Sequence, residues 1–122
     1  MPAPSPLTIA TQSVQRLVKE EKYYRKELTQ QSERVKKLEA DLKAGGEDAD
    51  SNAGFVLKQE QKAVDETRAV FAPLNKRIEE AVQRLEEQIA AAESENAPAD
   101  ELNKAKEALE LGKSVEEPPV VA

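Results

Sequence analysis

Apolar residues recur at steps of three and four positions along the first third of the chain. Such steps place the residues on one stripe of an α-helix. The stripe consists of Leu7, Ala10, Val14, Leu17, Glu21, Tyr24, Leu28, Gln31, Val35, Leu38 and Leu42. Only Glu21 and Gln31 interrupt its apolar character, and no proline or glycine lies between residues 7 and 44. The pattern predicts one long helix near 5–44, and its narrow stripe requires partner helices.

Both ends of this predicted helix carry terminating signals. Ser5 can act as the N-cap residue, and Pro6 suits the first helical position because its missing N–H costs nothing there. At the other end, Gly45 and Gly46 can adopt the left-handed backbone conformation that ends a helix.

The segment from Gly45 to Gly54 is rich in glycine and acidic residues, which predicts a turn between antiparallel helices. Asp50, Ser51 or Asn52 would cap the helix that follows. The segment lacks the Lys-Ser/Thr ending of a phosphate loop and the ligand spacing of a calcium loop.

A second helical stripe predicts a helix near 53–93. Its members are Leu57, Val64, Thr67, Phe71, Leu74, Ile78, Val82, Leu85, Ile89 and Ala92. Two successive steps of four around Ile78 shift the phase of the stripe, and Pro73 lies just before that shift. We interpret Pro73 as bending this helix along the first one, whereas the alternative is that the bend exposes a docking surface.

A second apolar group beside this stripe, formed by Val56, Ala63 and Val70, predicts contact with a further helix. That third helix is expected near 98–112, beginning at Pro98, with Gly112 as a candidate end unless the pattern continues to Val115.

The predicted third helix has Asp100 and Glu101 in its first turn, where negative charge is favourable. Its stripe consists of Leu102, Ala105, Ala108 and Leu109. Residues 1–4 and 116–122 are expected to be flexible tails, and residues 5–115 to form a single bundle. The predicted fold class is therefore all-α, an elongated antiparallel three-helix bundle with coiled-coil-like packing.

Composition narrows the function. The 122 residues contain neither histidine nor cysteine, which removes the commonest general base, the commonest metal ligand and the thiol nucleophile. We therefore predict no enzymatic activity, no catalytic residue, no cofactor and no metal. No apolar run is long enough to span a membrane and no secretion signal is present, so a cytoplasmic protein is expected.

The charge distribution points to protein partners. The formal net charge is −6, yet the segment from Leu7 to Ala44 is mildly basic. A chain without a concentrated basic patch is a poor nucleic-acid binder. The basic helix is better matched to neighbouring acidic segments of this chain or to an acidic protein partner.

Four residues of the first helix invite a specific interpretation. Glu21 and Gln31 are predicted to set the register by pairing with a Lys or Arg of a facing helix. Tyr24 lies on the stripe and is expected in the core. Tyr23 lies off the stripe, and the sequence leaves open whether it anchors an interface or merely packs.

Three short blocks of the first helix resemble the tubulin-binding cofactor A family. They are Val14-Gln15-Arg16-Leu17-Val18-Lys19-Glu20, Tyr24-Arg25-Lys26-Glu27 and Gln30-Gln31. The acidic turn, the proline inside the second helix and the short third helix extend the likeness to roughly residues 5–115. The resemblance implies a cytoplasmic, cytoskeleton-associated chaperone that holds β-tubulin on the way to heterodimer assembly, without nucleotide or catalysis. Other tubulin-folding cofactors are further partners that it allows, and since some members dimerise, a homodimer is left open.

The partner-binding residues expected from these blocks and from exposure are Lys19, Glu20, Tyr23, Lys26 and Glu27. Tyr23 is added on exposure alone. The alternative function is a coiled-coil scaffold or adaptor subunit of a cytosolic complex, in which the same stripes would join helices of other proteins.

Overall fold

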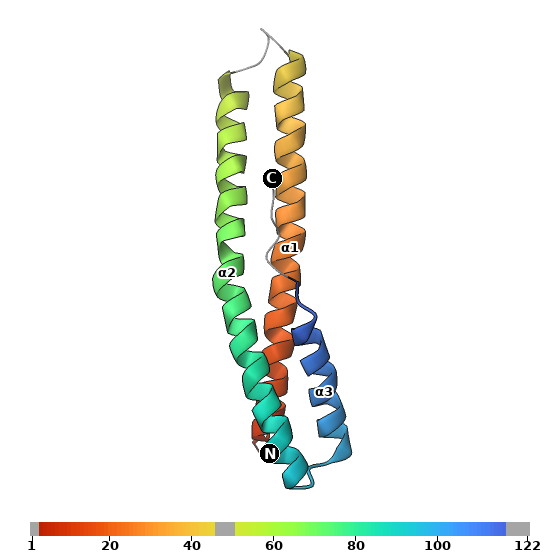
Figure 1. Ribbon diagram of the computed structural model, residues 1–122. Coiled ribbons are helices and arrows are strands. Elements are labelled where there is room, and N and C mark those ends of the chain that lie inside the picture. Colours follow the sequence, from red (N-terminus) through yellow and green to blue (C-terminus); the bar gives the residue numbers. More distant parts are fainter. Residues whose placement is uncertain (1–2, 46–50, 117–122) are drawn as a thin grey trace. The chain divides into compact units, whose positions relative to one another are not determined.

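The computed structural model describes residues 3–45 and 51–116. In this part of the chain the secondary structure consists of three α-helices and no strand: α1 (Pro6–Gly45), α2 (Ser51–Ser94) and α3 (Ala99–Lys113) (Figure 1). The all-α, three-helix fold class predicted from the sequence is confirmed.

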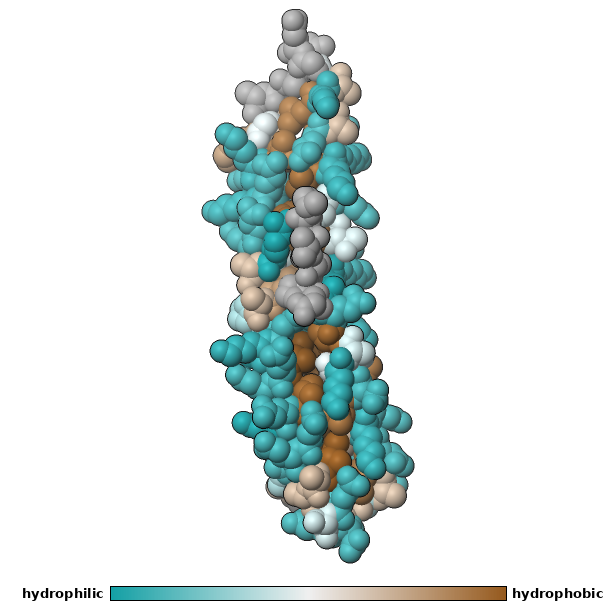
Figure 2. All heavy atoms as spheres, in the orientation of Figure 1, coloured by the Kyte–Doolittle hydropathy of each residue, from teal (hydrophilic) through white to brown (hydrophobic). Residues whose placement is uncertain are grey.

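The chain divides into two compact units, each described here by itself. Unit 1 contains residues 1–22 and 72–122, and unit 2 contains Tyr23–Phe71. Unit 1 therefore holds the start of α1, the end of α2 and all of α3. Unit 2 holds only the remaining parts of α1 and α2. On the face that Figure 2 shows, most outward residues are hydrophilic and hydrophobic residues show between the helices.

The core of unit 1 is built by all three helices. Its buried residues are Leu7, Ala10, Val14, Val18, Leu85, Ile89, Ala92, Ala105 and Ala108. Most of them belong to the predicted stripes, but Val18 lies beside the first stripe. Val18 is only 4% exposed because unit 1 has a third helix to cover this flank.

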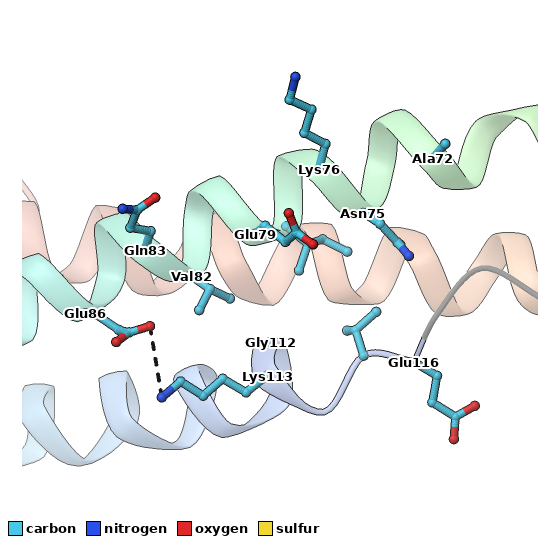
Figure 3. A pocket seen from close by; sticks show the side chains of 12 residues that line it. Ala72, Asn75, Lys76, Glu79, Val82, Gln83, Glu86, Gly112, Lys113 and Glu116 are labelled. Carbon is cyan, nitrogen blue, oxygen red and sulfur yellow. Dashed lines mark ion pairs between the residues drawn. The ribbon is translucent and has the colours of Figure 1, made fainter.

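Gly112 lies where α3 packs tightly against α1 and α2. A Cβ atom built on Gly112 would lie 2.5 Å from Val82 Cγ2 and 3.0 Å from Val14 Cγ1. Figure 3 shows Gly112 facing Val82 of α2. Gly112, the candidate end of the third helix, lies inside it: the helix continues to Lys113, within the allowed extension to Val115, and Gly112 is buried. Its lack of a side chain permits close packing rather than a turn.

The start of α1 is tied to the start of α3 by polar side chains. The Thr8 backbone N–H donates to Ser5 Oγ at 3.1 Å, which confirms Ser5 as the N-cap residue. The hydroxyls of Ser5 and Thr8 also lie 3.2 and 3.1 Å from Glu101 Oε1. Glu101 therefore links the two helix starts, a role that its first-turn position alone did not reveal.

The turn between α2 and α3 is a Schellman-type ending. The Ala97 N–H donates to the Ala92 carbonyl at 3.0 Å, and the Asn96 N–H donates to the Glu93 carbonyl at 3.3 Å. Asn96 has a φ of 55°, a left-handed conformation that asparagine tolerates better than most residues. Pro98 occupies the N-cap position of α3, so the prediction that it is the first helical residue is wrong.

Unit 2 is a two-helix hairpin with a thinner core. Leu28, Val64 and Phe71 are buried, whereas the stripe residues nearer the turn are only half-buried. The half-buried set is Val35, Leu38, Leu42 and Leu57. Arg34 of α1 pairs with Glu60 of α2 at 3.4 Å, an ion pair across the hairpin.

One expectation about unit 2 needs correction, and another stays a prediction. The group Val56, Ala63 and Val70 is half-buried and belongs to unit 2, whereas α3 belongs to unit 1, and the contact of this group with a further helix stays a prediction. The predicted turn is too long, because Ser51–Gly54 is already helical. Asp50, one of the three predicted capping residues, lies outside the described residues.

Pro73 lies within α2, on its exposed side in unit 1. It has no N–H to donate to the preceding turn, which weakens the helix at this point. That the proline bends α2, as opposed to exposing a docking surface, stays a prediction.

Candidate protein-binding face of α1

In unit 1, the acidic and the basic residues of α1 face different directions. In unit 1, every exposed residue of α1 is neutral or basic: Pro6, Ile9, Gln12, Gln15, Arg16, Lys19 and Lys22. The two acidic residues of this stretch, Glu20 and Glu21, lie toward the neighbouring helices and are half-buried and buried. All the charges among the exposed residues of α1 in unit 1 are therefore positive.

The acids of this stretch are occupied within the chain. Glu20 Oε1 lies 3.8 Å from Arg77 Nη2 of α2. Glu21 is only 3% exposed, as its place on the stripe predicted. Within the described ranges no ion pair joins these acids, or any other, to Arg16, Lys19 or Lys22.

The outward face of α1 in unit 2 is mixed. Lys26, Lys36, Lys37 and Lys43 are exposed there, together with Glu33, Glu39 and Asp41. Gln31 Nε2 donates to Glu27 Oε1 at 3.4 Å, a contact within α1 rather than the predicted pairing of Gln31 with a cation of a facing helix. Gln31 Oε1 is buried and makes no hydrogen bond.

The adjacent residues Tyr23 and Tyr24 contact each other through their rings. Their ring centroids are 5.3 Å apart at an interplanar angle of 76°, an edge-to-face contact. Tyr24 is half-buried and Tyr23 is 61% exposed. Tyr24 thus holds one side of the Tyr23 ring in place while the other side faces solvent.

The five residues expected to bind a partner fall into two groups. Lys19 and Glu20 belong to unit 1, and Tyr23, Lys26 and Glu27 belong to unit 2. Lys19, Tyr23 and Lys26 are exposed, whereas the two acids are half-buried and hold side chains of this chain.

Sequence reasoning missed the separation of charges on α1. Arg16 and Lys22 share the outward face with Lys19, yet only Lys19 was singled out. The available signal was the spacing: Arg16, Lys19 and Lys22 follow at steps of three, and both acids fall on or beside the apolar stripe.

Unit 1 also has a groove of about 780 Å³ between α2 and the end of α3 (Figure 3). It arises because α3 ends at Lys113 while α2 continues alongside. Its lining mixes apolar side chains with opposite charges, and Lys113 is paired with Glu86 at 4.0 Å. Asn75 Oδ1 at the groove is buried without a hydrogen-bond partner.

Further site searches covered residues 3–45 and 51–116. Across these ranges there is no group of three or more acidic residues placed to hold a metal ion. None of the helices there combines the length and the apolar content needed to cross a membrane.

An all-helical fold, an apolar core reserved for packing and an outward helix face of unpaired cations define a protein-interaction module. The family model for tubulin binding cofactor A matches residues 2–109. The chain therefore belongs to the tubulin-binding cofactor A family, as its first-helix blocks indicated. Comparisons with curated proteins and with solved structures returned no match. Membership implies a tubulin-binding cofactor, a chaperone-like class rather than an enzyme class.

Proposed function

We propose that this protein captures β-tubulin folding intermediates and holds them until heterodimer assembly, without catalysis. The observation that carries the proposal is the family match over residues 2–109, which includes all of α1 and most of α3. A cofactor of this kind acts in the cytoplasm, in association with the cytoskeleton and with other tubulin-folding cofactors.

The outward side of α1 is the contact surface in this proposal. Lys19, Tyr23 and Lys26 are exposed and available to a partner. Glu20 and Glu27 act at the edge, because each already holds a side chain of this chain, Arg77 and Gln31 respectively. An aromatic ring supplies affinity, while exposed charges chiefly set the association rate and selectivity.

The test is binding kinetics between the full-length protein and purified β-tubulin. Tyr23→Ala is expected to raise the dissociation rate by about ten-fold, since exposed aromatic anchors commonly contribute a kcal/mol or more to an interface. Phe55→Ala is the matched control, because Phe55 is similarly exposed at 59% in the same unit but lies on α2. Circular dichroism should show wild-type helicity for both variants.

The outcomes separate the proposed site from the proposed function. If Tyr23→Ala and Phe55→Ala bind like the wild type, the contact surface lies elsewhere than Tyr23. If the wild type itself does not bind β-tubulin and instead co-purifies with helical subunits of another complex, the scaffold or adaptor function replaces this one. Light scattering of the free protein, run beside these measurements, determines whether it is a monomer or a homodimer.

The charge test avoids Glu20. Reversing Glu20 to lysine would place a cation beside Arg77, 3.8 Å away, and would add a repulsion within the chain to any effect on binding. Lys19→Glu alone leaves that ion pair intact and is expected to lower the association rate with β-tubulin.

A further inference from the structure

We define the cationic strip of unit 1 as Arg16, Lys19 and Lys22. Its charge is opposite in sign to the net charge of the rest of the unit. All three side chains are exposed, and no exposed residue of α1 in this unit is acidic. In the remainder of unit 1, from Ala72 to Glu116, acidic residues outnumber basic ones by eleven to six. A cationic strip on an otherwise acidic unit is not explained by solubility, since net negative charge already supplies that.

The spacing of the strip limits what can pair with it. Steps of three residues along a helix separate neighbouring cations by about 4.5 Å along the axis, so the strip is about 9 Å long. An extended peptide advances about 3.3 Å per residue, so a run of three or four acidic residues matches this length. The strip therefore has the dimensions of a short acidic segment.

We infer that the cationic strip binds a glutamate- or aspartate-rich segment of a partner protein. The inference rests on the proposed function in so far as that partner is β-tubulin, and it specifies which chemistry the partner presents. The acidic surfaces of α2 and α3 repel the same segment, so they direct it to the outward face of α1.

A protein segment fits better than a nucleic acid. Each phosphate that a protein neutralises needs its own Lys or Arg, and three cations neutralise only a short stretch of a backbone. A longer polyanion would run onto the acidic surfaces of the same unit. A short acidic peptide ends before it reaches them.

The experiment measures fluorescence anisotropy of a labelled peptide of four glutamates titrated with the full-length protein, because four extended residues match the length of the strip. The wild type is expected to bind, with an affinity that falls as salt is raised because exposed charges are screened. The double variant Arg16→Glu with Lys22→Glu is expected to weaken peptide binding by about ten-fold or more, since each reversal replaces an attraction with a repulsion. Lys19 is kept so that the variant leaves the residue singled out for β-tubulin binding in place.

The matched control is Lys76→Glu with Arg84→Glu. Both residues are exposed on α2 in unit 1, and the two reversals change the net charge of the protein by the same amount. Peptide affinity of this control within about two-fold of the wild type supports a site on α1, because a general effect of net charge would weaken both variants equally. Circular dichroism verifies that both variants are folded.

Three results would overturn the inference: no peptide binding by the wild type, equal loss in both double variants, or tighter binding of a four-nucleotide oligothymidylate than of the peptide. Parallel binding to β-tubulin keeps the two proposals distinguishable. A wild type that binds β-tubulin but not the peptide refutes the acidic-segment inference alone. A wild type that binds the peptide but not β-tubulin retains the strip and removes the proposed partner.

Discussion

At the scale of single residues, Gly112 and Gly54 show how differently two helical glycines are used. A Cβ on Gly112 would come within 2.5 Å of Val82 Cγ2, whereas a Cβ on Gly54 would meet nothing within 4 Å. Gly112→Ala should therefore destabilise the protein by about 1–3 kcal/mol through overpacking. Gly54→Ala should stabilise it by about 0.5 kcal/mol, because alanine favours helix more than glycine does. Urea unfolding measures both changes.

Val82 supplies the control for this pair. Adding Val82→Ala to Gly112→Ala removes the clashing methyl group, so the double variant should recover part of the stability that Gly112→Ala loses. An unchanged unfolding midpoint for Gly112→Ala alone would mean that α3 shifts without cost and that the close approach is not needed.

At the scale of the helices, the buried stripe of each unit should determine its stability. Leu85 of unit 1 is fully buried and Leu28 of unit 2 is 3% exposed. Leu85→Ala and Leu28→Ala should each lower the free energy of unfolding by about 2–4 kcal/mol, the usual cost of truncating a buried leucine. Denaturant melts of the two variants test this.

Leu38→Ala is the matched comparison for Leu28→Ala. Leu38 lies on the same stripe of the same helix but is only half-buried, so its truncation should cost less. Equal costs at Leu28 and Leu38 would show that the stripe is packed more evenly than its exposure indicates.

The helices were predictable from the sequence to the extent that their own periodicity determines them. The stripes of α1 and α2 identified Val14, Leu28 and Leu85 as buried, because a helix face is set by local spacing. The burial of Val18 and the packing role of Gly112 were not predictable, since both depend on where a separate helix lies. A pattern within one helix does not carry that information.

The same limit applies to the candidate site. The sequence singled out Lys19, Tyr23 and Lys26, and their exposure follows from their positions off the stripe. It did not reveal that Glu20 is held by Arg77, because that ion pair joins residues on two helices far apart in sequence. Only the tertiary structure separates the available cations from the engaged acids.

At the scale of the whole molecule, the two units differ in the number of helices that build them, because the short α3 belongs to unit 1 alone. The 15 residues of α3 span about 22 Å, whereas the 40 residues of α1 span about 60 Å. The third helix therefore supports only part of the longer helices, and the residues of unit 2 pack as a pair. The stripe of α1 keeps its spacing through both units, whereas the stripe of α2 shifts phase around Ile78, close to the unit boundary at Ala72. From the sequence we interpret that shift, with Pro73 beside it, as a bend of the helix and not as a division between units.

Unequal support predicts unequal local stability. Helical amides exchange with solvent when a segment opens, and opening costs less where fewer apolar side chains are buried. Amides of α1 and α2 near the half-buried Val35 and Leu57 of unit 2 should exchange about ten-fold or more faster than those near Val14 and Leu85 of unit 1. Native-state hydrogen exchange read by mass spectrometry measures this difference.

Gly112→Ala provides the internal control for the exchange experiment. This variant disturbs only contacts of unit 1, so it should speed exchange around Val14 and Leu85 and leave Val35 and Leu57 nearly unchanged. Equal protection of both units in the wild type would contradict the prediction, because it would mean that two helices alone hold unit 2 as firmly as three hold unit 1. Faster exchange in both units of the variant would show instead that the units open together, and the boundary between them would then have no energetic meaning.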